Sequence, residues 1–259
     1  MPIFEAGSDP GANFGELLRR VGLSPFDAVS VENELIVPHA TTCVAMRCKD
    51  GVVMAGDRRA TSGNLISHRS MEKVVQADEF SGVAIAGAAG PAMEMIKLFQ
   101  LQLEHYEKVE GQTLSLEGKA NQLSSFVRSN LPAAMQGLVV VPIFAGFDFF
   151  SNSGRLWDYD VTGGRYEEKD FVATGSGMLH ASTVMRIAWR RDLATDEAIK
   201  LCARALWEAS DADSATGGPD SLRGIYPVIA SITKQGWSSV TDESLTKIYG
   251  DIALEVGAR

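Results

Sequence analysis

A pair of threonines stands where a loosely patterned leader meets the first strongly apolar strand of the sequence. The run His39-Ala40-Thr41-Thr42 opens that strand. Cleavage after Ala40 would leave Thr41 with a free α-amine beside its own hydroxyl. Because an α-amine has a pKa near ~8, it can act as a general base close to neutral pH without help from a histidine. Threonine is common in strands, so the placement of Thr41, rather than its type, suggests nucleophilic catalysis.

Other residues that could carry chemistry lack the partners that they need. Cys43 and Cys48 have no second pair of zinc ligands, because the four histidines are isolated from one another. Ser176 lies between two glycines, but no third glycine of a dinucleotide loop follows it, nor any Lys-Ser or Lys-Thr. Its surroundings also fail the Gly-x-Ser-x-Gly pattern. We therefore expect no zinc site, no nucleotide loop and no serine hydrolase.

The elements that must position these residues alternate between groups of strands and groups of helices. Strand patterns cover residues 41–48, 52–56, 74–75, 83–86, 139–147, 154–159, 171–174, 226–233 and 236–240, and helical patterns cover 92–106, 115–137, 178–190 and 195–210. A last helix begins at Asp242, whose side chain we expect to cap it. Two stacked antiparallel sheets with helices outside both would bury every apolar face. The predicted fold class is α+β, a four-layer αββα sandwich.

Composition narrows the classes of partner. The chain of 259 residues has 24 basic and 33 acidic side chains, a net charge of −9, and no basic cluster that could neutralise phosphates. The most apolar stretch, Leu138–Phe150, is shorter than the ~20 residues of a membrane helix. The N-terminus does not resemble a secretory signal, and the cysteine count of 3 is odd. We expect a cytoplasmic protein with no disulfide, no nucleic-acid partner and no membrane span.

Six separated segments share one resemblance. They are Thr41-Thr42-Cys43-Val44-Ala45, Gly56-Asp57-Arg58-Arg59-Ala60-Thr61, Glu72-Lys73-Val74, Ile85-Ala86-Gly87, Thr174-Gly175-Ser176-Gly177 and Asp213-Ser214-Ala215-Thr216-Gly217-Gly218. In this order they resemble the catalytic segments of proteasome β subunits, over essentially all of residues 41–259. Two further runs, 103–108 and 217–220, are similar to the actinobacterial type.

The resemblance implies the N-terminal-nucleophile hydrolase fold and a threonine endopeptidase. Residues 1–40 would be a propeptide that the chain removes by cutting itself between Ala40 and Thr41, and residues 41–259 a single catalytic domain. The enzyme would then degrade unfolded proteins to peptides inside a closed chamber. Ala40 stands where the family usually has glycine, and a Cβ there would slow a cleavage that bends the peptide bond sharply.

The resemblance also implies a role for each catalytic position. Thr41 would be the nucleophile, and Asp57 and Lys73 would form an ion pair beneath it that favours its alkoxide character. For an arbitrary Asp and Lys, a weak surface salt bridge would be the default interpretation. Gly87 would donate its backbone N–H to the developing oxyanion.

Further residues would hold the α-amine and the substrate. Ser176, Asp213 and Thr216 are implied to hydrogen-bond around the amine of Thr41 and to help move its proton. Thr61 and Ala89 would bind the backbone of an extended peptide. The pocket for the side chain before the cut would be apolar and lined by Ala60, Met71, Val75, Ile85 and Met93.

Partners follow from the same resemblance. It implies seven-membered β rings enclosed between rings of a separate α subunit, a ring-shaped ATPase activator, and protein substrates, among them proteins tagged by a small ubiquitin-like protein. It implies no metal and no organic cofactor. The leader is short for the bacterial type, which argues against a part for the leader in assembly.

Three alternatives stay open from the sequence. A simpler bacterial threonine peptidase forms rings without an α subunit, but generally lacks a segment like residues 213–218. A non-catalytic ring subunit would have lost the threonine or the lysine. An amidase of another N-terminal-nucleophile family would use similar sheets and a similar amine, with a closed pocket for one small ligand.

Overall fold

The computed structural model describes residues 41–63 and 65–258. The leader and the cleavage position at Ala40 therefore lie outside the described residues. The elements below belong to the unit that contains the predicted catalytic domain.

The first sheet carries the start of the predicted catalytic domain. Its strand order is β10-β1-β2-β11-β12, and every neighbouring pair is antiparallel. The strands are β1 (Thr42–Cys48), β2 (Gly51–Gly56), β10 (Phe171–Gly175), β11 (Val228–Thr233) and β12 (Gly236–Ser239). The two strands predicted over residues 41–48 and 52–56 form a hairpin, because β1 pairs along its length with β2 across a turn at Lys49 and Asp50.

The second sheet supplies the opposite wall. Its order is β5-β6-β7-β8-β9, again antiparallel throughout. The strands are β5 (Val74–Asp78), β6 (Ser81–Gly87), β7 (Val140–Asp148), β8 (Ser153–Tyr159) and β9 (Arg165–Glu168). A separate small hairpin joins β3 (Ala60–Ser62) to β4 (Leu65–His68).

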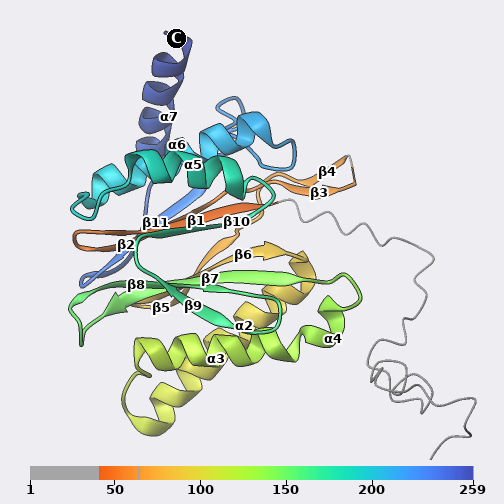
Figure 1. Cartoon of the computed structure of the whole chain (residues 1–259), viewed down its shortest axis with the longest axis vertical. Helices are drawn as coiled ribbons and strands as arrows, with labels where there is room; N and C mark the ends of the chain where they lie inside the picture. The colour runs from red at the N-terminus through yellow and green to blue at the C-terminus, as the bar shows by residue number, and fades with distance from the viewer. Residues whose placement is uncertain (1–40, 64, 259) are drawn as a thin grey trace, which may run out of the picture. The chain divides into compact units, whose positions relative to one another are not determined.

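Helices cover the outer faces of both sheets, which gives the predicted four layers (Figure 1). The second sheet is covered by α2 (Ala89–Glu110) and α3 (Leu116–Ser129), followed by the short α4 (Leu131–Ala134). The first sheet is covered by α5 (Met178–Ala188) and α6 (Thr195–Ala212), and α7 (Asp242–Gly257) packs against α6. In the part of the chain that the structure describes, no helix has the length and apolar character to span a membrane.

Strand β1 is apolar along nearly its whole length instead of alternating between apolar and polar residues. Cys43 and Ala45 face the other sheet, whereas Val44 and Met46 face the helices. Successive strand residues point to opposite faces, and both faces are covered here, so both sets are buried. The strand that follows Thr41 is therefore held rigidly on both sides.

Two sequence predictions about helix ends were wrong. The helix predicted over residues 115–137 ends at Ser129, and Pro132 lies in the separate α4. Proline cannot donate the backbone hydrogen bond that would continue α3. The cap of α7 is Thr241, whose side chain accepts from the amide of Ser244, so the predicted cap Asp242 is the first helical residue.

Because the Cys43 thiol is buried, we expect the protein to lose stability in alkali. Burial raises the pKa of the Cys43 thiol from 9.0 to about 12, although the nearby Lys73 acts in the opposite direction. In the unfolded chain the thiol ionises near its ordinary pKa of 9.0. The stability that comes from keeping the buried thiol protonated is therefore fully present below pH 9.0, and it is lost as the pH rises through the pKa of the folded state. Between these limits the free energy of unfolding of the wild type should fall with pH more steeply than that of Cys43→Val, by on the order of 1 kcal/mol per pH unit. Urea unfolding in reductant at several pH values measures this, and parallel curves would contradict it.

Candidate active site

A buried ion pair forms the floor of the site. Asp57 follows the end of β2 and Lys73 precedes β5, so the pair joins the two sheets. The Lys73 Nζ lies 2.7 Å from Asp57 Oδ1, and the side chains are 2% and 0% exposed. The same ammonium donates to the carbonyl of Arg59 at 2.5 Å. A surface salt bridge was the default interpretation of these residues, and the structure excludes it.

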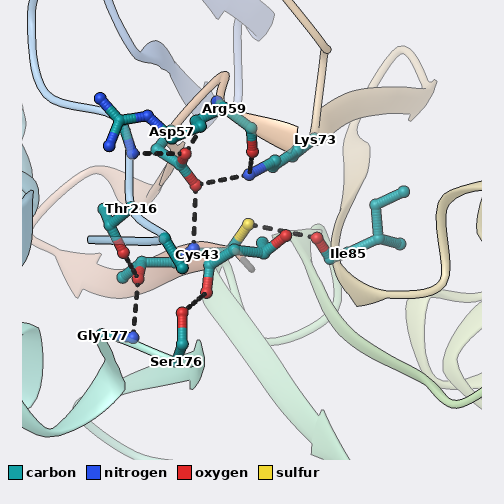
Figure 2. A network of polar contacts seen from close by, with 12 residues as sticks. Cys43, Asp57, Arg59, Lys73, Ile85, Ser176, Gly177 and Thr216 are labelled. Atoms are coloured by element: carbon teal, nitrogen blue, oxygen red, sulfur yellow. Dashed lines mark hydrogen bonds and ion pairs between the residues drawn. The ribbon is translucent and has the colours of Figure 1, made fainter. Parts of the chain in front are cut away.

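The Asp57 carboxylate organises the backbone around it (Figure 2). Its Oδ1 accepts the amide of Thr42 at 2.9 Å in addition to the ammonium of Lys73. Its Oδ2 accepts the amides of Arg59 at 2.9 Å and Gly217 at 2.8 Å. Each of these contacts comes from a donor, so the site fits an ionised carboxylate on both oxygens. These backbone partners carry no sequence signal beyond the motifs that contain them.

Thr41 immediately precedes β1 and lines the same cavity as Lys73. It is 4% exposed, and its carbonyl accepts the Ser176 amide at 2.8 Å. The Ser176 hydroxyl also reaches that carbonyl, at 3.4 Å. The turn that joins β10 to α5 therefore fixes the backbone of Thr41 from one side.

A second carboxylate, that of Asp213, accepts hydrogen bonds from two hydroxyls. Asp213 Oδ2 accepts the hydroxyls of Ser176 and Thr216, each at 2.6 Å. Burial acts to raise the pKa of Asp213, but these hydrogen bonds and the amide of Ala215 outweigh it and hold the pKa below its ordinary value. The carboxylate is therefore ionised at neutral pH. The Thr216 hydroxyl lies against the hydroxyl of Thr42, 2.5 Å away, rather than being committed to Thr41 alone.

A cavity of about 270 Å³ opens over the ion pair. Thr41, Lys73 and Gly87 all line it. Five predicted substrate residues also line it: Ala60, Thr61, Met71, Ile85 and Ala89. The sequence did not identify the other lining residues, which are Ser62, Ala86, Ala88, Gly90, Pro91, Ala92 and Leu138.

Two residues predicted for the side-chain pocket lie elsewhere. Val75 and Met93 do not line this cavity and instead pack against the core cluster between the second sheet and its helices. Neighbouring strand residues alternate in direction, and Val75 follows Val74, which faces the other sheet. Val75 thus points toward the helices.

Gly87 ends β6 in a conformation that other residues avoid. Its φ is +118°, and a Cβ would lie 2.1 Å from the carbonyl oxygen of Val139. A side chain is therefore excluded by both the backbone dihedral and the neighbouring strand. Gly87 lines the same cavity as Thr41, and because glycine has no side chain, it is its backbone that faces this cavity.

The residues that the structure describes include no group of three or more His, Cys, Asp or Glu side chains arranged to hold a metal ion. The chemistry that this arrangement supports is acid–base and nucleophilic, because a threonine, a buried ammonium and a glycine line one cavity and two carboxylates lie near the start of β1.

Comparison with known proteins identifies the family. Residues 37–222 match the family model described as "Proteasome subunit". The "Proteasome subunit beta" of Acidimicrobium ferrooxidans is 52% identical, and the alignment covers 100% of this chain and 95% of that protein. The corresponding proteins of Streptomyces griseus and Acidothermus cellulolyticus are 56% and 54% identical, over 83% and 81% of this chain and 76% and 73% of theirs. The chain therefore belongs to the proteasome subunit family, as a β-type subunit of the threonine peptidase class.

Proposed function

We propose that Thr41 is the nucleophile, and that the chain frees its α-amine by cutting between Ala40 and Thr41. The observation that carries this proposal is the buried pair of Lys73 and Asp57 beneath a cavity that Thr41 lines. A buried ammonium favours an ionised oxygen nearby, and the carboxylate keeps that ammonium charged and oriented. Neither residue has solvent access that would explain the pair as a surface contact.

The proposed reaction has two balanced steps. In the first, the Thr41 oxygen bonds to the substrate carbonyl carbon, its proton passes to the α-amine, and that proton then leaves with the departing peptide amine. The backbone N–H of Gly87 stabilises the oxyanion. In the second, the α-amine takes a proton from a water molecule as the water oxygen bonds to the ester carbon. That proton then passes to the Thr41 oxygen as the ester bond breaks, which releases the other peptide as a carboxylic acid and restores the enzyme.

The second carboxylate has a supporting part in this proposal. Asp213 holds Ser176 and Thr216, and Ser176 holds the carbonyl of Thr41. These contacts place hydroxyls and an ionised oxygen around the backbone of the nucleophile. A positioned amine transfers its proton efficiently only within hydrogen-bond reach, so this support serves the proton transfer.

An extended peptide is the proposed substrate. Thr61 belongs to β3 and Ala89 begins α2, and both line the cavity. Among the described residues the Thr61 hydroxyl is buried without a hydrogen-bond partner, which suits a group that meets a substrate. Ala60, Met71 and Ile85 give the cavity an apolar wall, which favours apolar side chains before the cut.

We propose the same assembly that the resemblance implies. Residues 1–40 act as a propeptide, seven copies form a ring, and the rings stack between rings of an α subunit with the active sites facing inward. A ring-shaped ATPase would deliver unfolded proteins in the cytoplasm, some of them tagged by a small ubiquitin-like protein. No cofactor takes part in the proposed chemistry.

Intact mass spectrometry of the chain co-expressed with its α subunit tests the proposal. The expected mass lacks residues 1–40, and a β-lactone, which acylates nucleophilic hydroxyls, should add once, at Thr41. A full-length chain without adduct in an assembled particle would overturn the proposal and favour a non-catalytic ring subunit.

A further inference from the structure

Thr42, the residue after the proposed nucleophile, is fully buried and uses every polar group that it has. Its amide donates to Asp57 Oδ1 at 2.9 Å, and its carbonyl accepts the Asp57 amide at 3.1 Å. Its hydroxyl accepts the Gly177 amide at 3.0 Å and lies 2.5 Å from the hydroxyl of Thr216. Thr42 is therefore bonded to three separate segments of the chain.

The direction of the hydroxyl chain follows from the carboxylate at its end. Thr216 donates its proton to Asp213, because an ionised carboxylate can only accept. The hydroxyl of Thr42 must then donate to the oxygen of Thr216, and it accepts from Gly177. The order is Gly177 N–H to Thr42 to Thr216 to Asp213, with each hydroxyl donating once and accepting once. Such chains polarise one another and hold a single geometry.

The neighbouring turn is built closely around this hydroxyl. A Cβ on Gly177 would lie 2.4 Å from the Thr42 oxygen and 2.8 Å from the Thr216 oxygen. The backbone thus approaches the hydroxyl pair as closely as a residue without a side chain allows. Figure 2 shows the chain of contacts converging on the start of β1 from Gly177, Thr216 and Asp57.

Thr42 is linked by hydrogen bonds to two separate carboxylates, directly to Asp57 and through Thr216 to Asp213. Through its amide it is held by Asp57, which is paired with Lys73. Through its hydroxyl and Thr216 it is held by Asp213, which also binds Ser176. Thr42 does not line the cavity, so it has no direct route to a substrate. It is one peptide bond from Thr41, and small errors in the placement of a reacting group reduce rates strongly.

We propose that Thr42 is a positioning residue for the proposed reaction: its side-chain hydroxyl fixes the backbone of Thr41 between the Asp57–Lys73 pair and the Asp213 group. The inference rests on the proposed function of Thr41. It requires the hydroxyl itself, not merely a side chain of this size, to sustain turnover.

Steady-state peptide hydrolysis by Thr42→Val particles tests this, since valine keeps the shape and removes the hydroxyl. The expected result is a fall in kcat of about 10-fold with an unchanged KM, because the lost hydrogen bonds lie away from the cavity. Thr42→Ser keeps the hydroxyl and should stay within about threefold of the wild type. Thr183→Val, the same change at an exposed helix position, should leave both constants unchanged. Intact mass and sedimentation confirm that each particle is processed and assembled before its rate is compared.

If Thr42→Val fails to assemble, Thr42→Ser and Thr42→Cys provide the comparison, because cysteine is a poor hydrogen-bonding substitute. The serine variant should then be the faster of the two. A wild-type kcat in Thr42→Val or Thr42→Cys, or an equal loss in the serine and cysteine variants, overturns the role of the hydroxyl. A wild-type particle that neither processes itself nor hydrolyses peptides instead refutes the proposed function, so the two failures are distinguishable.

Discussion

Thr41→Ala particles should hydrolyse peptides at least about 10⁴-fold more slowly than the wild type, because a removed nucleophile leaves only binding and oxyanion stabilisation. They should also retain residues 1–40, since the same hydroxyl would attack the bond before it. Nothing else in the described cavity offers a replacement: its other hydroxyls, on Thr61 and Ser62, lie on the β3–β4 hairpin rather than beside the buried ammonium.

Two variants separate catalysis from processing. Thr41→Ser retains an oxygen at the same position and should keep both self-cleavage and measurable hydrolysis. A chain that begins at residue 41 and carries Thr41→Ala has no leader to remove, and it should still be inactive. Hydrolysis by that chain at the wild-type rate would show that another residue is the nucleophile. Retention of the leader in the unmutated chain would contradict self-cleavage.

The architecture was largely predictable, because most strands and helices show a clear hydrophobic pattern. The hairpin β1–β2 and the buried face of α2 were predicted from local patterns alone. The small hairpin β3–β4 and the edge strand β9 were missed, since they are short and mostly lie on the surface, where burial imposes no alternation. The break before α4 was also missed, although Pro132 gave a signal for it.

The site was less predictable, because its contacts join residues that are distant in sequence. In the sequence, only the surrounding motifs marked Asp57 and Lys73 as site residues. That the two side chains are buried is shown by the structure. Thr42 was noted as part of the threonine pair but received no role of its own, since its hydroxyl partner Thr216 is 174 positions away. Val75 was predicted for the pocket, but it packs against the core cluster on the helix side of β5, because a sequence does not show which face of a strand points toward a cavity.

Lys73→Met should reduce peptide hydrolysis by about 10³-fold and destabilise the chain by about 3–5 kcal/mol. Methionine keeps the apolar stem but leaves the carboxylate of Asp57 buried without its ammonium. Asp57→Asn should be similarly inactive, because both carboxylate oxygens face donors only and an amide must turn its NH₂ group toward some of them. Lys108→Met, at a pair whose side chains are 73% and 59% exposed, is the matched control and should change stability by less than about 1 kcal/mol.

The double variant Lys73→Met/Asp57→Asn distinguishes a catalytic pair from a structural one. It contains no uncompensated buried charge. Its loss of stability should therefore be about 2 kcal/mol smaller than the sum of the losses in the two single variants. Activity should not recover with it, since the ammonium beneath Thr41 is still missing. Urea unfolding of the chains and hydrolysis by assembled particles measure the two quantities separately. If activity returned in proportion to stability, Lys73 would support the fold rather than the reaction, and its proposed role at the nucleophile would be wrong.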